Sequence, residues 1–275
     1  PRSRGLGDVY KRQLACSYID RIEKYDGKLE SYITVTKEKA LLDAENAQKR
    51  IDSGNAPELC GIPIAVKDNI CTDGIKTTCA SKMLENFIPP YNATVMEKLY
   101  SKGIVLLGKT SMDEFAMGGS TQTSAFAKTK NPYDIKKVPG GSSGGSASCV
   151  SASLCAASLG SDTGGSIRQP ASFCGVTGLK PTYGRVSRYG LIAFASSLDQ
   201  IGPVAKDAHD CGIILNAIAG YDRHDGTASK NPTIDYTSAI GKSMKGVKIA
   251  LPKEFYGEGI DREVADAVIA AAKKY

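Results

Sequence analysis

The stretch GSDTGGSIRQP, residues 160–170, combines three glycines with threonine, aspartate and Ser166 in one turn-prone segment. A glycine turn can bring successive backbone N–H groups together, and such groups stabilise the negative charge that develops when a neighbouring serine attacks a carbonyl. The N–H groups of Thr163, Gly164, Gly165 and Ser166 are therefore candidates for an oxyanion hole, and Ser166 is a candidate nucleophile. A glycine turn followed by a serine N-cap explains the same residues without any chemistry.

A serine nucleophile needs a proton acceptor, and the chain has only two histidines, His209 and His224, both in polar surroundings where exposure is expected. Lys67 ends the apolar run of GIPIAVKDNI, residues 61–70. A lysine at the end of a strand is commonly solvated. In a desolvated site its ammonium form is disfavoured, so its pKa falls and the amine can act as a general base near neutral pH.

A second Gly/Ser loop, VPGGSSGGSAS at residues 138–148, lies between these two segments. It lacks the lysine of a phosphate-binding loop, and a flexible connection is the simple alternative. It also matches G-x-S-x-G with Ser142 or Ser143 at the centre, which leaves open an α/β-hydrolase that uses His209 or His224 as base. However, no apolar strand leads into this loop. A non-catalytic glycine-loop binding module is a third reading.

The remaining pattern predicts strands separated by helices around one layered sheet, an α/β fold. The composition of residues 117–146 predicts a long loop, and loops of this length in a compact domain are usually functional or disordered. The predicted strands are 32–35, 62–66, 104–108 and 246–251. One predicted helix begins at Leu14, and further helices are predicted at 92–103, 146–160, 205–220 and 261–275. Another helix is predicted from the 3.6-residue period of Ala40, Leu41, Ala44, Ala47 and Ile51.

Composition excludes several classes of protein. Eight cysteines without a C-x-x-C pair or histidines at metal-ligand spacing predict reduced, buried thiols and no metal site. Apolar runs are too short for a membrane span, so we expect a soluble, cytoplasmic protein. Residues 1–13 resemble translated sequencing adapter and carry half of the formal net charge of +6, so charge gives little support for nucleic-acid binding.

Lys67, Ser142 and Ser166, in this order and with these flanking residues, resemble the Ser-Ser-Lys triad of the amidase signature family. The resemblance implies that Ser166 forms the acyl-enzyme, Ser142 bridges, and Lys67 is the base, with the amides at 163–166 as oxyanion hole. It also implies a mixed β-sheet covered by helices on both faces. Met117, Gly118 and Gly119 are expected to line the substrate pocket, with a plain connecting loop as the alternative.

Within that family, residues 159–203 and the stretch TSMDEFAMGGSTQTSAF at 110–126 resemble the A subunits of the aspartyl/glutamyl-tRNA amidotransferases. This implies a glutaminase that supplies ammonia to a B subunit, which uses ATP and Mg²⁺ to amidate Glu-tRNA(Gln), while a C subunit braces the contact. No cofactor is expected on this chain. We predict that residues 14–275 are the N-terminal part of one domain, truncated at the C-terminus, and that a stand-alone amide hydrolase is the rival function.

Overall fold

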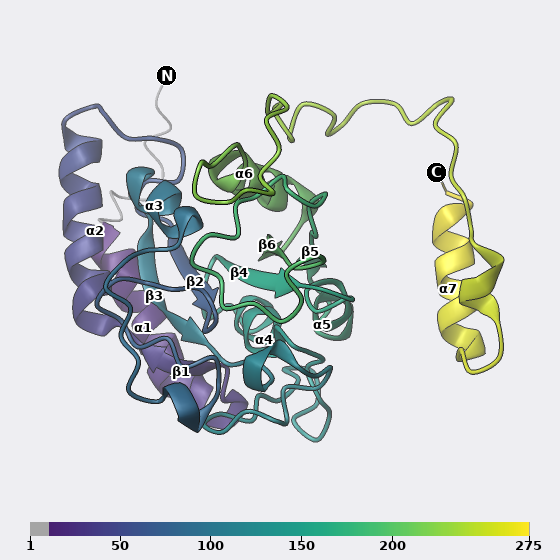
Figure 1. Ribbon diagram of the computed structural model, residues 1–275, viewed down its shortest axis with the longest axis horizontal. Coiled ribbons are helices and arrows are strands. Elements are labelled where there is room, and N and C mark those ends of the chain that lie inside the picture. Colours follow the sequence, from purple (N-terminus) through teal and green to yellow (C-terminus); the bar gives the residue numbers. More distant parts are fainter. Residues whose placement is uncertain (1–10, 275) are drawn as a thin grey trace. The chain divides into compact units, whose positions relative to one another are not determined.

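The computed structural model describes residues 11–274 (Figure 1). The helices in this range are α1 (Lys11–Leu29), α2 (Lys37–Asp52), α3 (Thr94–Ser101), α4 (Gly144–Ser151), α5 (Arg168–Phe173), α6 (Ala208–Ile218) and α7 (Arg262–Ala272). The strands are β1 (Tyr32–Val35), β2 (Pro63–Lys67), β3 (Val105–Thr110), β4 (Ala157–Asp162), β5 (Thr177–Gly178) and β6 (Gln200–Ala205). Short 3-10 helices occupy Lys82–Leu84, Glu114–Ala116 and Lys253–Tyr256.

The six strands form one mixed sheet in the order β1-β3-β2-β4-β6-β5. β2 lies at the centre, parallel to both β3 and β4, whereas β1, β6 and β5 pair antiparallel with their neighbours. Parallel central strands are typically buried on both faces and read as continuous apolar runs, which is the character of residues 62–66. The register places Lys67 at the end of β2, opposite Thr110 of β3.

Helices cover both faces of the sheet, as predicted (Figure 1). On one face, α3 and α6 pack against alternate residues of the strands, among them Ile64, Val66 and Leu159. On the other face, α1, α2 and α4 pack against Ala65 and its neighbours. Because side chains alternate along a strand, Lys67 shares the face of Ala65, which α4 covers.

The predicted helix at 146–160 is wrong in its second half. α4 ends at Ser151, and Ser153 takes a left-handed conformation with φ 57°, which stops the helix. The chain then enters β4 at Ala157, where it pairs with β2 and β6. Small residues such as alanine and serine fit a helix or a crowded strand equally well, so the sequence offered no signal at the change.

Two compact units divide the chain between Thr237 and Ser238, and the sheet belongs to the first. The second contains α7, whose N-cap Asp261 accepts a hydrogen bond from the N–H of Glu263. The predicted strand at 246–251 is wrong: the described residues of this unit contain no strand. A strand needs a neighbour to satisfy its backbone groups, and none is present there. That residues 14–275 form one domain stays a prediction.

The chain start also differs from expectation. α1 begins at Lys11 rather than Leu14, so the last three residues of the predicted non-native leader are helical, while residues 1–10 lie outside the described part. No helix within residues 11–274 combines the length and apolar character that crossing a membrane requires.

Candidate active site

Lys67 is fully buried, and its Nζ lies among three serine hydroxyls. Nζ is 2.7 Å from Ser142 Oγ, 2.9 Å from Ser143 Oγ and 2.9 Å from Ser161 Oγ, with the Ser161 carbonyl at 3.3 Å. The strand-end lysine predicted as a base is therefore enclosed rather than solvated, and it contacts the predicted bridging serine.

The pKa of Lys67 is lowered to about 7 because burial disfavours the charged ammonium. Charges on Cys79, Asp113, Asp162 and Asp199 favour the ammonium and oppose this shift, but burial outweighs them. At neutral pH a substantial fraction of the amine is thus uncharged and carries a lone pair, which a general base needs.

The backbone around Ser142 is held from two sides. The N–H of Gly141 donates to Gln169 Oε1 at 2.8 Å, and the carbonyl of Ser142 accepts from the N–H of Asp113 at 3.2 Å. The Gly141–Ser142 peptide bond is cis. α4 begins immediately after Ser143, so its positive end faces the loop that carries both serines.

Ser166 lies half-buried in the glycine turn that follows β4. Its carbonyl accepts a hydrogen bond from the N–H of Ser143 at 3.1 Å, so the turn and the Gly/Ser loop are joined through their backbones. The structure brings Lys67 and Ser142 into direct contact, whereas Ser166 is joined through its carbonyl to the backbone of the neighbouring Ser143. Among the described residues, the Ser166 hydroxyl has no hydrogen-bond partner within 3.5 Å.

Asp162 holds the glycine turn through its side chain. Its buried carboxylate accepts from the N–H groups of Gly165, Ile167 and Arg168 at 2.8, 2.9 and 3.2 Å. The Arg168 guanidinium binds the same carboxylate through Nε and Nη2 at 3.1 and 3.0 Å. Burial raises the pKa of Asp162, but the Arg168 and backbone hydrogen bonds outweigh it and hold this pKa below its usual value.

The predicted oxyanion hole changes in one member. The N–H of Gly165 already donates to Asp162, so it is engaged in holding the turn. The N–H groups of Thr163, Gly164 and Ser166 make no hydrogen bond within residues 11–274 and remain the candidates. The side chain of Thr163 is fixed by donating to Asp199 Oδ1 at 2.5 Å.

Met117, Gly118 and Gly119 are exposed beside the Gly/Ser loop. The Gly119 carbonyl accepts from Gln169 Nε2 at 3.0 Å, so the side chain that binds the N–H of Gly141 also binds this segment. Their role as pocket lining stays a prediction.

Four residues of the site were missed by sequence reasoning: Asn69, Ser143 as a lysine partner, Ser161 and Gln169. Asn69 Nδ2 donates to Ser161 Oγ at 3.0 Å, and Ser143 Oγ donates to the Ser161 carbonyl at 3.0 Å. Ser161 directly precedes Asp162 in the glycine turn, so its position was the one signal that could have suggested a role.

The two histidines lie elsewhere. His209 is exposed, and His224 Nδ1 lies 3.0 Å from Asp222 Oδ1. Neither contacts Ser142 or Ser143, and a loop rather than a strand leads into these serines. The arrangement therefore disfavours the histidine-dependent α/β-hydrolase reading.

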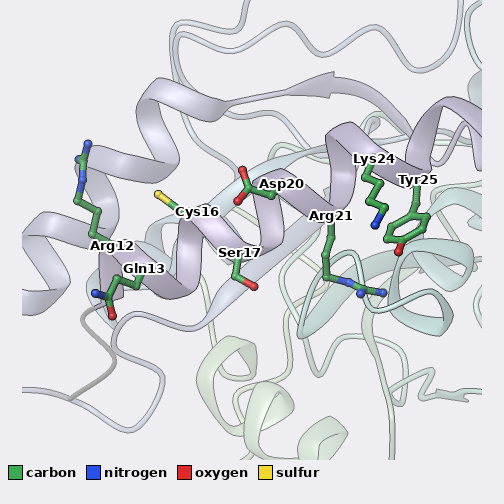
Figure 2. Close-up of a pocket in the computed structure, with 8 residues that line it drawn as sticks. All are labelled: Arg12, Gln13, Cys16, Ser17, Asp20, Arg21, Lys24 and Tyr25. Carbon is green, nitrogen blue, oxygen red and sulfur yellow. The ribbon is translucent and has the colours of Figure 1, made fainter. Parts of the chain in front are cut away.

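A separate surface hollow of about 540 Å³ is lined, among residues 11–274, by side chains of α1 (Figure 2). Its lining residues are Arg12, Gln13, Cys16, Ser17, Asp20, Arg21, Lys24 and Tyr25. The Arg21 guanidinium there already donates to the carbonyls of Ala152 and Ser153. None of these residues belongs to the surroundings of Lys67.

Comparison with known proteins gives a consistent family match. The family model described as Amidase matches residues 13–274. The chain is 59% identical over 268 residues to the A subunit of the glutamyl-tRNA(Gln) amidotransferase from Ruminiclostridium cellulolyticum, covering 97% of this chain and 55% of that protein. The chain thus spans about half the length of such curated relatives.

Solved structures agree. The crystal structure of the A subunit of the glutamyl-tRNA(Gln) amidotransferase from Thermotoga maritima is similar with a TM-score of 0.83 and 46% identity, over 93% of this chain and 54% of that one. The native peptide amidase from Stenotrophomonas maltophilia is similar with a TM-score of 0.80 and 37% identity, over 84% and 50% of the two chains.

Proposed function

This chain belongs to the amidase family, and on that premise we propose that it hydrolyses the side-chain amide of glutamine as the glutaminase subunit of a glutamyl-tRNA(Gln) amidotransferase. The observation that carries the proposal is the 2.7 Å contact between the buried Lys67 amine and the Ser142 hydroxyl. The likeness to the A subunits of such amidotransferases supports the choice of glutamine over other amides.

The first chemical step is attack by Ser166. The neutral Lys67 amine accepts the Ser142 proton, Ser142 takes the proton of Ser166, and Ser166 Oγ forms a bond to the amide carbon. The carbonyl electron pair moves onto oxygen, where the N–H groups of Thr163, Gly164 and Ser166 are the donors we assign to the oxyanion.

The intermediate then collapses and the enzyme is restored. The proton held by Lys67 passes through Ser142 to the leaving nitrogen, the C–N bond breaks, and ammonia departs from a glutamyl ester on Ser166. Water attacks that ester with the same amine as base, glutamate leaves, and Ser166 regains its proton. One lysine therefore serves as base and acid in turn, which suits a pKa near neutrality.

The released ammonia is proposed to serve a partner. By its resemblance to the A subunits, this chain would act in the cytoplasm with a B subunit that binds ATP, Mg²⁺ and Glu-tRNA(Gln), and with a C subunit. The chain itself would hold no cofactor. In this reading the ammonia converts misacylated Glu-tRNA(Gln) to Gln-tRNA(Gln).

A stand-alone amide hydrolase is the second candidate, because a peptide amidase shares the fold at 37% identity. The two functions share the proposed triad, so turnover separates them. Release of ammonia from glutamine that increases when B and C subunits are added supports the amidotransferase. Turnover of peptide or aryl amides by the isolated chain supports the hydrolase.

The triad itself is tested with 6-diazo-5-oxo-L-norleucine, an electrophilic glutamine analogue. We expect a covalent adduct on the peptide containing Ser166 by mass spectrometry, and no adduct in Ser166→Ala or Lys67→Ala. His209→Ala and His224→Ala are matched controls that should label normally. An adduct on Ser142 or Ser143, or labelling that depends on a histidine, would refute the assignment.

A further inference from the structure

Asn69 and Ser161 form a second layer behind the Lys67 amine. Both are buried, with 1% and 4% of their surface exposed, and Asn69 Nδ2 lies 3.0 Å from Ser161 Oγ, which lies 2.9 Å from Lys67 Nζ. Within residues 11–274, the side chain of Asn69 makes no hydrogen bond to Ser142 or Ser166, and its hydrogen bond is to Ser161. Ser161 therefore connects Asn69 to the Lys67 amine.

The hydrogen-bonding capacity of the amine limits what its neighbours can do. A neutral lysine has two N–H donors and one lone pair, whereas an ammonium has three donors and none. The Ser143 hydroxyl already donates to the Ser161 carbonyl at 3.0 Å, so toward Lys67 its oxygen is an acceptor. Ser142 and Ser161 are left as competitors for the lone pair.

Only one outcome of that competition supports proton transfer. If Ser142 donates to the lone pair, Lys67 is placed to take its proton. If Ser161 donates instead, Lys67 must donate to Ser142, and the relay runs in the wrong direction.

The carboxamide of Asn69 can determine whether Ser142 or Ser161 donates to the lone pair of Lys67. In the structure its Nδ2 faces Ser161, and its Oδ1 is buried without a hydrogen-bond partner among residues 11–274. A half-turn of the amide exchanges the positions of Nδ2 and Oδ1 and brings Oδ1 to Ser161, where it accepts the hydroxyl proton. Ser161 then presents a lone pair to Lys67 in both protonation states of the amine.

We propose that Asn69 is a positioning residue that, by accepting the Ser161 hydroxyl proton, keeps Ser161 an acceptor toward Lys67 and leaves the lone pair of the amine to Ser142. The proposal rests on the proposed role of Lys67 as base. It assigns Asn69 a function in the reaction although the residue touches neither substrate nor nucleophile.

The test measures the rate at which a fluorophosphonate modifies Ser166 in the full chain between pH 5.5 and 9.5, by intact-mass spectrometry. Asn69→Leu keeps the volume and removes both amide ends. We expect its plateau rate to fall about tenfold, the worth of one well-formed buried hydrogen bond.

The double variant Asn69→Leu/Ser161→Ala is the decisive arm. Removing Ser161 removes the competitor, and the carbonyl of residue 161, at 3.3 Å, remains as acceptor for the amine. We therefore expect the double variant to recover to within about twofold of Ser161→Ala alone, a non-additive result. A purely structural role predicts losses that add, and that result would overturn the proposal, as would a wild-type rate in Asn69→Leu.

The pH profile provides an independent arm. The ionisable groups that face Lys67 are Cys79, Asp113, Asp162 and Asp199, and no variant alters them. Ser161→Ala removes an acceptor for the ammonium, so the acid limb should move to lower pH, whereas Ser161→Thr keeps the hydroxyl and should keep the midpoint. The comparison of Ser161→Ala with Ser161→Thr provides the test if Asn69→Leu and Asn69→Ala both fail to unfold cooperatively. In that case, a Ser161→Ala profile with the same midpoint as the wild type rejects the proposal.

Lys67→Ala in the same assay separates the two levels of inference. If that variant still reacts at Ser166, the proposed function fails. If it is inert while the Asn69 variants behave as wild type, only the role of Asn69 fails.

Discussion

The backbone N–H of Ser143 donates to the carbonyl of Ser166 over 3.1 Å, joining the loop that carries the bridging serine to the turn that carries the nucleophile. The two segments approach from different elements, one preceding α4 and the other following β4. The bond involves only main-chain atoms, so it survives replacement of either side chain. Substitutions of Ser142 or Ser166 can therefore report on chemistry with little change in the way the loops are joined.

The pH dependence of Ser166 modification should follow the Lys67 amine. Its pKa is lowered to about 7, and the neutral form is the reactive one, so the rate should increase with pH around a midpoint near 7 and level off above. One unit above the midpoint about ten amines are neutral for each ammonium. The rate of fluorophosphonate labelling checks this, and a flat profile between pH 5.5 and 9.5 contradicts it.

Asp162→Asn should destabilise the protein by about 2–3 kcal/mol, because a buried carboxylate that accepts three N–H groups and a guanidinium loses its charge. The folded-state pKa of Asp162 is lowered, so its contribution is present above the unfolded value of 3.8 and is lost as pH falls through the folded value. Urea unfolding at pH 7 and at pH 3 measures this. The difference in the free energy of unfolding between the wild type and Asp162→Asn should be smaller at pH 3. The Arg168 side chain is half-exposed, so Arg168→Met should lower the free energy of unfolding by about 1 kcal/mol or less.

Gln169→Glu should weaken glutamine binding more than it changes the fold. The carboxylate can still accept from the N–H of Gly141, but it cannot donate to the carbonyl of Gly119. We expect KM for glutamine to increase about tenfold, with Tm nearly unchanged, because one polar contact at the loop is lost. Equal KM values for the variant and the wild type would show that residues 117–119 do not shape the pocket.

Gly145→Ala and Gly164→Ala form a matched pair. A Cβ at Gly145 would lie 2.5 Å from the carbonyl oxygens of Ser31 and Ser111, whereas a Cβ at Gly164 would meet nothing within 4 Å. The first change should cost about 1–3 kcal/mol through overpacking, and the second should stay within about 0.5 kcal/mol. Thermal unfolding of both variants measures this, and equal Tm values would contradict it.

The sequence predicted the framework well where apolar periodicity was strong. Residues 32–35 form a strand as predicted, and the strand predicted at 62–66 is present as β2, Pro63–Lys67, one residue further along the chain. The helices α2, α3 and α6 lie in the expected segments. Prediction failed where small residues give no period, as at the junction of α4 and β4, and where β6 contains Gly202 and Pro203, which usually argue against a strand.

For the site, sequence could identify residue types but not the direction of side chains. Lys67 was singled out because a charged residue ends an apolar run. The glycines left Ser142 and Ser143 as alternatives, and only the family resemblance singled out Ser142 as the bridging serine. Ser161 and Asn69 were missed because they matter through a hydrogen bond between their side chains, and the two residues are 92 positions apart in the sequence. Such long-range contacts leave no local pattern.

The Lys67 contacts with Ser142, Ser143 and Ser161 span 75, 76 and 94 residues of chain. At about 5–20 residues per second, a ribosome needs on the order of 5–20 s after adding Lys67 to supply the last of these serines. During that time the amine remains in water with its usual pKa of 10.5 and is a cation like that of any exposed lysine. The base is thus made by folding, and a nascent chain that stops short of β4 carries the lysine without its reactivity.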